Sequence, residues 1–148
     1  MTNKIDLTPA QQERVAQLRR MTPREWDAIC KKCGICCLIK FDMGGNQIVY
    51  IKRSCVHLDC NSRECKIYSE RLTCRLGKCH KVDIDLVLAG GMVPDSCGYR
   101  EYIFGPAKYP AVVDFSTVRP MDDLKIKRIS PQEFFACIIP ESIRWNNR

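Results

Sequence analysis

Four cysteines lie within eight residues of this 148-residue chain, in the segment Cys30-Lys-Lys-Cys33-Gly34-Ile-Cys36-Cys37. The Cys-x-x-Cys-Gly pattern is typical of metal knuckles, because two intervening residues let both sulfurs reach one ion and glycine lets the backbone turn its N–H groups toward sulfur. Adjacent cysteines point in different directions, so Cys36 and Cys37 suit two neighbouring centres better than one. The spacing therefore predicts metal ligation by thiolates.

The chain carries eleven cysteines, several times the usual number for one domain of this length. The other seven are Cys55, Cys60, Cys65, Cys74, Cys79, Cys97 and Cys137. Disulfide bonds are one alternative, but a disulfide framework expects an even count and an apolar N-terminal signal segment. The chain shows neither, and no apolar run approaches the roughly 20 residues of a membrane span. We therefore expect a cytoplasmic protein with reduced thiols and no membrane contact.

Buried cysteine acting as a small hydrophobic side chain is the second alternative. It fits Cys137, which stands between Ala136 and Ile138 on the apolar face of a predicted helix. It does not fit the cluster, which Lys31 and Lys32 interrupt. Metal binding remains the explanation for the cluster.

The identity of the metal stays open at this point. Ligation by thiolates alone suits both zinc and iron–sulfur centres. Cys30, Cys33 and Cys36 occupy the first three positions of a bacterial ferredoxin run, but the fourth cysteine with its proline is missing. The knuckle glycine favours mononuclear zinc slightly. We expect Zn²⁺ or an iron–sulfur cluster, in one or two centres.

The formal net charge of +7 would normally suggest an acidic partner such as nucleic acid. Each four-thiolate site carries a charge of about −2, so two sites would remove about four positive charges. Many basic residues stand beside the cysteines, namely Lys31, Lys32, Arg53, Lys66, Arg71, Arg75, Lys78 and Lys81. Compensation of thiolate charge explains them at least as well, so nucleic acid is not favoured as a partner.

Two helix starts precede the cluster. Thr8-Pro9-Ala10-Gln11 and Thr22-Pro23-Arg24-Glu25 each combine a capping box with proline at the first helical position. The first helix is weakly amphipathic, and we expect it to be peripheral. In the second, the helical spacing from Trp26 onward predicts that Cys30 and Cys33 lie on the buried face and that Gly34 ends the helix.

Short elements follow the cluster. A hairpin is expected from residues 38–43 and 47–51, with Gly44-Gly45-Asn46 as the turn. The pieces from 55 to 79 are expected to be irregular or single-turn helical. Further predictions are a helix over 82–89 ended by glycine, weak strands at 111–115 and 125–129, a third capping box at 130–133 that starts a helix, and a tail partly frayed from 141.

These elements predict an α+β fold, a small irregular domain in which short helices surround a cysteine-ligated metal centre beside a β-hairpin. We divide the chain into a peripheral N-terminal helix at 1–21, a metal-binding domain at 22–105, and a C-terminal extension at 106–148 that packs on the same domain.

The motifs also carry a family resemblance. Glu25-Trp26 followed by Cys30-x-x-Cys33-Gly34-x-Cys36-Cys37-Leu38 resembles the bacterial cysteine-cluster family named for its CxxCxxCC motif, the YkgJ/YcgN-like proteins. Cys65-Lys-Ile-Tyr68-Ser-Glu-Arg71 is similar to the family's second motif, Cys74-Arg75 and Cys79 to its continuation, and Pro94-Asp-Ser-Cys97-Gly-Tyr99-Arg100 to its Pro-x-x-Cys-x-Tyr-Arg segment. The resemblance covers about residues 22–105.

Membership in that family implies a small zinc- or iron-chelating domain. The resemblance carries the family's metal ligands to Cys30, Cys33, Cys36, Cys37, Cys55, Cys65, Cys74, Cys79 and Cys97. Whether Cys60, His57 or His80 also ligates stays open. Tyr68, Arg71, Tyr99 and Arg100 are expected to support the site, with arginine N–H groups donating to sulfur or to backbone carbonyls and tyrosine rings excluding water. The alternative for these four is an anion or substrate pocket.

The leading hypothesis is a metal-binding protein whose ion organises a fold poor in apolar residues, with metal ions and an unidentified protein as partners. No catalytic motif is present, so the sequence leans away from an enzyme. An iron–sulfur-dependent redox or group-transfer enzyme is the first alternative, since a related domain occurs in flagellin lysine methylases. A zinc-dependent nucleic-acid-binding module is the second alternative.

Overall fold

The structure, a computed structural model, describes residues 5–45, 47–68 and 82–146. Its helices are α1 (Pro9–Arg19), α2 (Pro23–Ile29), α3 (Ile84–Ala89), α4 (Gly98–Phe104), α5 (Asp123–Lys127) and α6 (Pro131–Cys137). Short 3-10 helices are η1 (Ile35–Cys37), η3 (Phe115–Thr117) and η4 (Pro140–Arg144). The strands are β1 (Leu38–Asp42), β2 (Ile48–Ser54), β3 (Leu58–Asp59), β4 (Glu64–Cys65) and β5 (Arg119–Pro120). The fold is mixed α+β, as predicted.

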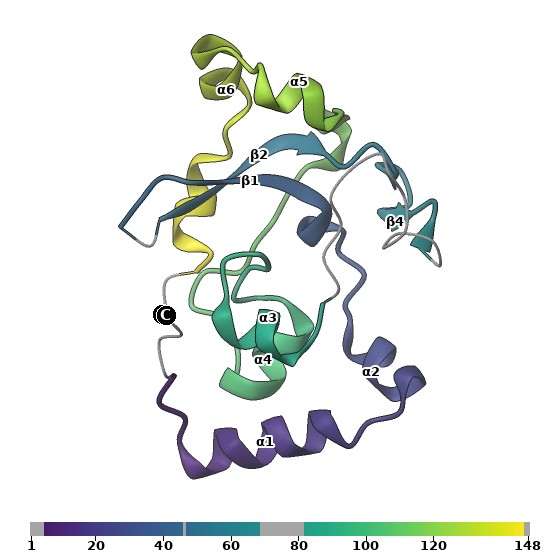
Figure 1. Cartoon of the computed structure of the whole chain (residues 1–148), viewed down its shortest axis with the longest axis vertical. Coiled ribbons are helices and arrows are strands. Elements are labelled where there is room, and N and C mark those ends of the chain that lie inside the picture. Colours follow the sequence, from purple (N-terminus) through teal and green to yellow (C-terminus); the bar gives the residue numbers. More distant parts are fainter. Residues whose placement is uncertain (1–4, 46, 69–81, 147–148) are drawn as a thin grey trace.

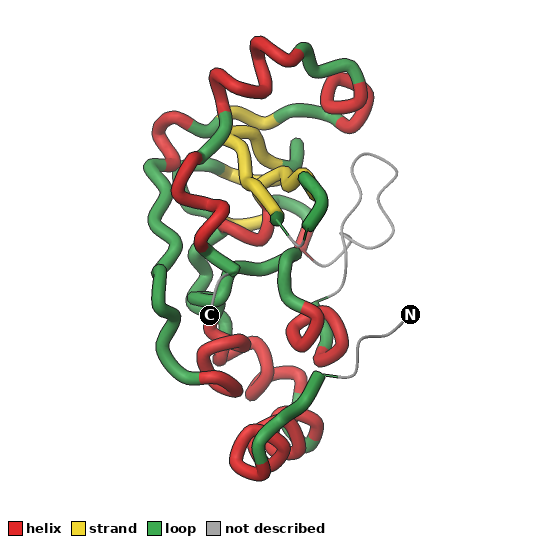
Figure 2. Tube along the Cα trace, turned by 90° about the vertical axis from the view of Figure 1, so that its left-hand side faces the viewer, coloured by secondary structure: helices red, strands yellow, loops and turns green. Residues whose placement is uncertain are grey.

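The elements form two lobes (Figure 1). Helices α1 to α4 contact one another and make up the helical lobe. Strands β1, β2 and β5 contact one another, β2 also contacts α6 and η4, and these elements make up the sheet lobe. Figure 2 shows the same division from the side, with the strands in the upper half and α1 at the lower end. Each lobe has its own hydrophobic core.

The sheet lobe is built on the predicted hairpin. Strands β1 and β2 pair antiparallel, and β5 pairs parallel with β2 on the other side. Its core consists of Ile35, Leu38, Tyr50, Leu58, Val113, Phe115, Val118, Ile139 and Trp145. The rings of Tyr50 and Trp145 meet edge to face at 5.1 Å, and both residues are buried. Aromatic pairs of this geometry add to the stability that buried area supplies.

The chain after Glu141 does not fray as expected. Trp145 is 2% exposed, and Ser142 is fully buried. The Ser142 hydroxyl accepts a hydrogen bond from the backbone N–H of Tyr50 at 2.8 Å. A frayed tail was expected because the neighbours of Trp145 in the sequence are polar. The indole of Trp145 nevertheless packs into the core of the sheet lobe and orders the segment.

The helical lobe has a smaller core. Its buried residues are Val15, Leu18, Ile84, Val87, Tyr99 and Ile103. Helix α1 begins with the predicted capping box and contributes Val15 and Leu18 to this core. The Arg14 guanidinium ties α1 to α4 by donating to the Ile103 carbonyl at 3.1 Å. Helix α3 ends at Gly90, whose φ of 71° favours glycine. The predicted helix over 82–89 is therefore confirmed within one or two residues.

Three local predictions need correction. The expected strand at 125–129 overlaps α5, because the Asp122 side chain accepts from the Lys125 N–H and caps a helix. The expected strand at 111–115 is coil that leads into η3. The segment from 55 was expected to be irregular or helical, but in its described part β3 and β4 form a small antiparallel pair, in which Leu58 is buried. The third capping signal does start α6, where Ser130 accepts from the Glu133 N–H.

Candidate metal centre

The expected ligands within the described residues are divided between the two lobes. Nine cysteines fall within the described residues, and none of these nine forms a disulfide bond with another. Cys33, Cys37 and Cys60 pack against the core of the sheet lobe. Cys30 and Cys97 pack against the core of the helical lobe. The other two expected ligands, Cys74 and Cys79, lie outside the described residues, as do Arg71 and His80.

The turn from Cys30 to Cys33 has the geometry of a knuckle, although no helix carries it. Helix α2 ends at Ile29, and Cys30 is already extended, with φ −64° and ψ 128°. The prediction that Cys30 and Cys33 share a buried helical face was therefore wrong, and none of the residues of α2 is buried. Lys32 and Gly34 have φ values of 54° and 75°, and these left-handed residues turn the chain on either side of Cys33.

Backbone N–H groups point at both sulfurs of this turn. The Lys32 N–H donates to Cys30 Sγ at 3.3 Å. The Ile35 N–H stands in the same relation to Cys33, two residues further along, and partly offsets the burial that raises the pKa of that thiol. Such N–H donors stabilise thiolate relative to thiol, which is the form that binds a metal. Both cysteines of the Cys-x-x-Cys segment thus have the donor that the sequence predicts.

Cys97 lies near this turn because Gly98, the residue after it, packs against the Ile29 backbone. A Cβ atom on Gly98 would lie 2.2 Å from the Ile29 carbonyl oxygen, so only glycine lets α4 begin directly against the end of α2. Lys31 reaches the same place, where its ammonium group donates to the Ser96 carbonyl at 3.0 Å and pairs with Glu101. The role of Gly98 was missed from the sequence, where the only signal is a glycine directly after a cysteine.

Cys37 and Cys55 form a second neighbourhood, inside the sheet lobe. The Cys55 N–H donates to the Cys37 carbonyl at 2.9 Å where β2 ends. Cys60 Sγ lies 3.8 Å from the Ser54 hydroxyl. Cys65 pairs with Leu58 across the β3–β4 pair. These cysteines therefore lie at or near strand ends, whereas Cys30 and Cys97 lie at helix ends.

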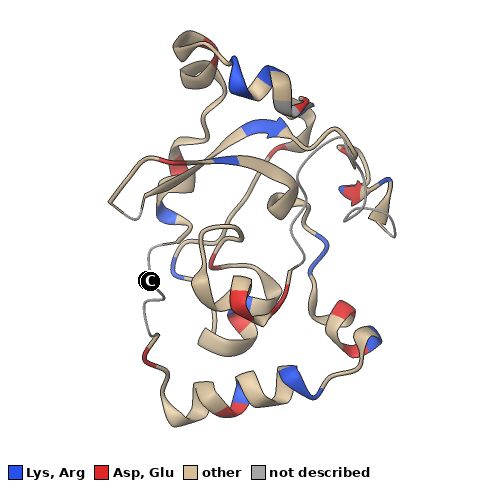
Figure 3. Ribbon diagram, viewed as in Figure 1, with Lys and Arg blue, Asp and Glu red and all other residues tan. Residues whose placement is uncertain are grey.

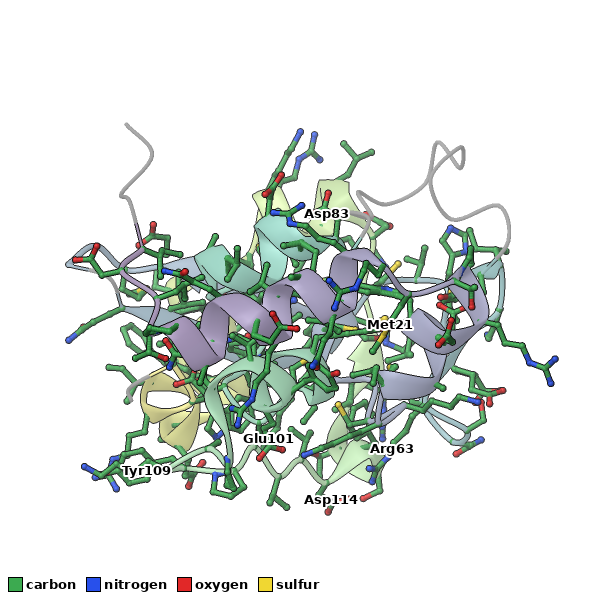
Figure 4. All side chains as sticks on the ribbon, turned by 90° about the horizontal axis from the view of Figure 1, so that it is seen from below. Met21, Arg63, Asp83, Glu101, Tyr109 and Asp114 are labelled. Carbon is green, nitrogen blue, oxygen red and sulfur yellow. The ribbon has the colours of Figure 1, made fainter. Side chains whose placement is uncertain are left out.

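Gly34 and Arg63 connect the two neighbourhoods. A Cβ on Gly34 would lie 3.0 Å from the Arg63 Cβ, so the knuckle packs directly on the β3–β4 turn. Arg63 stacks its guanidinium over the Phe115 ring at 4.5 Å. It also lowers the pKa of Asp114, after the Ser116 hydrogen bonds that act first, and Figure 4 shows the two side chains on one edge. Arg63 is a second positioning residue that sequence reasoning missed.

Burial and the neighbouring thiols raise the pKa of several of these cysteines. Burial, with a smaller contribution from the charges of Cys36 and Cys33, raises the pKa of Cys97 to about 11, against the N–H groups of Tyr99 and Arg100 that lower it. The pKa of Cys33 is raised in the same way, by burial and by Cys36 and Cys30. A hydrogen bond with Cys36 and burial raise the pKa of Cys37 far above its usual range, and Cys55 adds to this. Cys36 is thus electrostatically close to both neighbourhoods.

The donor chemistry suits a soft or borderline cation, since sulfur dominates and basic side chains stand beside it. Within the described residues, however, no three Cys, His, Asp or Glu side chains come together closely enough to hold a metal ion. His57 is partly buried beside the β3–β4 pair. The complete ligand set therefore remains the sequence prediction, with Cys74 and Cys79 as its further members.

The residues expected to support the site differ in burial and in contacts. Arg100 is buried, and its guanidinium donates from Nε to the Asp95 carboxylate at 3.1 Å and from Nη1 to the Val87 carbonyl at 2.6 Å. These contacts fit the structural role expected for it rather than an anion pocket. Tyr99 is buried, stacks on Trp26 at 4.4 Å, and has its pKa raised by burial and then by Cys30. Tyr68 is 54% exposed, and its hydroxyl donates to Asp27 at 3.4 Å.

Relatives named UPF0260 protein are similar to this chain. The protein from Shewanella denitrificans is 35% identical over 89 residues, or 60% of each chain. The protein from Shewanella amazonensis is 34% identical over 100 residues, or 65% of this chain and 68% of its own length. The protein from Pseudomonas putida is 33% identical over 84 residues, or 56% of this chain and 55% of its own length.

The matched region is therefore a little under two thirds of most of these relatives. No family model and no solved structure matches the chain. In the described part of the chain, every helix is too short or too polar to span a membrane. The relatives' name states neither a metal nor a cysteine motif, so the resemblance to the CxxCxxCC proteins stays a prediction. At this identity and coverage, the chain belongs to the UPF0260 family.

Proposed function

We propose that this protein binds zinc or an iron–sulfur centre through its clustered cysteines. The observation that carries the proposal is the knuckle itself, in which Lys32 and Gly34 adopt left-handed conformations and backbone N–H groups point at the sulfurs of Cys30 and Cys33. A free cysteine that only fills space has no need of a strained non-glycine residue beside it. The N–H groups of Tyr99 and Arg100 at Cys97 repeat the pattern from another element.

The positions of the cysteines support the same proposal over simple burial. Cys137 is 3% exposed inside the sheet lobe, as expected for a small hydrophobic side chain. The other described cysteines are half-buried or exposed instead, and Lys31 and Lys40 lie near some of them. The positive charges of these two lysines would stabilise thiolates bound nearby. The ligands in this proposal are the nine cysteines predicted from the sequence.

The two alternatives gain little from the structure. In Figure 3 the Lys and Arg residues of the described part of the chain are distributed over several elements, among them α1, α2, β1, β2 and α5, rather than gathered in one place, which does not favour nucleic-acid binding. For a redox or group-transfer enzyme, the described residues present the same thiols but no separate substrate site that we can assign. A labile position on an iron–sulfur centre would be the feature that such an enzyme needs.

Anaerobic purification followed by elemental analysis and an ultraviolet–visible spectrum tests the proposal. We expect stoichiometric zinc with a featureless visible spectrum, or iron and sulfide with absorbance near about 400 nm. Removing the metal with a chelator should unfold much of the chain, because each structural site supplies on the order of 10 kcal/mol of folding free energy. A circular-dichroism spectrum unchanged after complete metal removal would contradict a structural role.

A pair of cysteine variants supplies the control. Cys33→Ala should lower the metal content, since Cys33 belongs to the knuckle. Cys137→Ala should leave it unchanged, since Cys137 lies in α6 within the sheet lobe. Equal metal content in both variants would exclude the knuckle as a ligand.

A further inference from the structure

A surface groove lies between α5 and the first turn of α6, at the end of the sheet lobe that is remote from the helical lobe (Figure 1). Its volume is about 440 Å³. Ligand pockets in proteins usually measure about 300–1,000 Å³, so the groove is large enough to hold part of a ligand. It is lined by Met121, Asp122, Leu124, Lys125, Arg128 and Glu133.

The acidic side chains of the groove already have partners within the protein. The Asp122 carboxylate accepts a hydrogen bond from the Lys125 N–H at 2.8 Å and caps α5. The Glu133 carboxylate lies 3.8 Å from the guanidinium of Arg53 on β2. Lys125 and Arg128 are exposed, and neither forms an ion pair with a side chain that the structure describes. These two cations are therefore available to a partner.

Leu124 supplies an apolar contact on the same side of α5. Leu124 and Arg128 are four positions apart and therefore lie on one face of the helix, with Lys125 beside them. The side chain of Leu124 is 68% exposed. Lys127, two positions after Lys125, does not line the groove. An exposed leucine between two cations suits a ligand that combines an apolar side chain with carboxylates.

We propose that this groove binds an acidic segment of a protein partner, whose carboxylates pair with Lys125 and Arg128 and whose apolar side chain packs on Leu124. A concave site suits a peptide better than a flat lipid surface. None of the six lining residues is aromatic, so the groove has no ring on which a nucleic-acid base could stack. The inference does not depend on a bound metal, because none of the expected ligands lies in α5 or α6.

Selection of peptides on the full chain tests this inference. A phage-displayed library of random dodecapeptides is panned on the protein, and phage that bind the Lys125→Glu variant are removed. We expect the selected peptides to be enriched in Asp or Glu beside Leu, Ile or Phe. A synthetic peptide of the consensus sequence should then shift the amide NMR signals of residues 121–128 and 133. A selection without acidic enrichment, or shifts confined to other residues, would overturn the inference.

Two matched pairs of variants locate the contact. Lys125→Glu should weaken the affinity for the peptide about tenfold or more, and Lys127→Glu, which makes the same charge change on the same helix, about twofold or less. Leu124→Ser should weaken it as well and Phe135→Ser should not, although both side chains are 68% exposed. Unchanged amide signals in the rest of the chain check that each variant is folded. Equal losses in the two members of either pair would overturn the inference.

Three further titrations separate the other possible occupants. Vesicles of phosphatidylglycerol and phosphatidylethanolamine, an oligouridylate, and a peptide with lysine in place of each acidic residue should each shift residues 121–128 and 133 less than the acidic peptide does. Shifts as large with any of the three would indicate a membrane, nucleic-acid or nonspecific site and would overturn the inference. Shifts of the same residues that grow with protein concentration, without any ligand, would assign the groove to a second copy of the chain and would also overturn it.

Discussion

The sheet lobe and the helical lobe are stabilised by different kinds of contact. Tyr50, Phe115 and Trp145 give the sheet lobe a core rich in aromatic rings, and Ser142 satisfies a buried backbone N–H within it. The helical lobe has Tyr99 as its one buried aromatic among the described residues, and the rest of its core is aliphatic. Its helices are short, so packing rather than propensity must hold them. Stability in this molecule is therefore unevenly distributed, and cysteines pack against both regions.

The largest expected effect is in the sheet lobe. Trp145→Ala removes a side chain that is 2% exposed and packs on Tyr50. We expect the free energy of unfolding to fall by about 3–5 kcal/mol, measured by denaturant titration. Trp145→Phe keeps an aromatic ring and should cost clearly less. A loss below about 1 kcal/mol for the alanine variant would show that the C-terminal segment does not close this core.

In the helical lobe, Ile103→Ala should cost about 2–5 kcal/mol, because Ile103 is fully buried between α1 and α3. The same titration, followed by exchange of amides in α1, checks the size and place of the effect. Val112→Ala is the control, since Val112 is 81% exposed and its truncation should be nearly neutral. Damage that spreads equally into β2 would contradict the separation of the two cores.

Gly98→Ala probes the contact that brings Cys97 to Cys30. The added methyl group would meet the Ile29 carbonyl oxygen at 2.2 Å, so the ends of α2 and α4 must separate. We expect a loss of about 1–3 kcal/mol together with lower metal content by elemental analysis. Gly45→Ala is the control, because its Cβ would lie in open space and only the φ of 59° opposes it. Normal metal content in Gly98→Ala would show that this contact does not position a ligand.

The smallest expected effect concerns the cap of α2. The Thr22 hydroxyl accepts a hydrogen bond from the Glu25 N–H at 3.2 Å, and the Glu25 carboxylate accepts one from the Thr22 N–H. Thr22→Ala should cost about 1 kcal/mol, as measured by thermal unfolding. Thr8→Ala removes the same box from α1, which carries two core residues, and should cost no less. A larger loss at Thr22 would mean that α2 contributes more to the helical lobe than its exposed residues indicate.

Much of the local structure could be predicted because its signals are local. The boxes at Thr8 and Thr22, the glycine turn of the hairpin, and the end of α3 at Gly90 all depend on residues within one turn of one another. Short-range hydrogen bonds of this kind have recognisable sequence patterns. The knuckle at Cys30 was found for the same reason.

Other features depend on partners far along the chain. Helix α2 was expected to continue through Cys33, but the contact of Gly98 with Ile29 and the left-handed Lys32 require an extended turn there. Arg63 was overlooked because nothing near it in sequence reveals that Gly34 packs on it. In the same way, the weak strand signal at 125–129 could not reveal that Asp122 caps a helix. Tertiary contacts override local preference at each of these places.

The hydrogen bond from the Tyr50 N–H to Ser142 joins residues that are 92 positions apart. A ribosome adds about 5–20 residues each second, so the acceptor is made roughly 5–20 s after the donor. During that interval β2 has emerged, but the residues that cover its inner face have not. Cys33, Cys37 and Cys60 pack against this same core. We therefore expect their sulfurs to be reachable by ions, and by oxidants, throughout synthesis and to become enclosed only when Trp145 arrives.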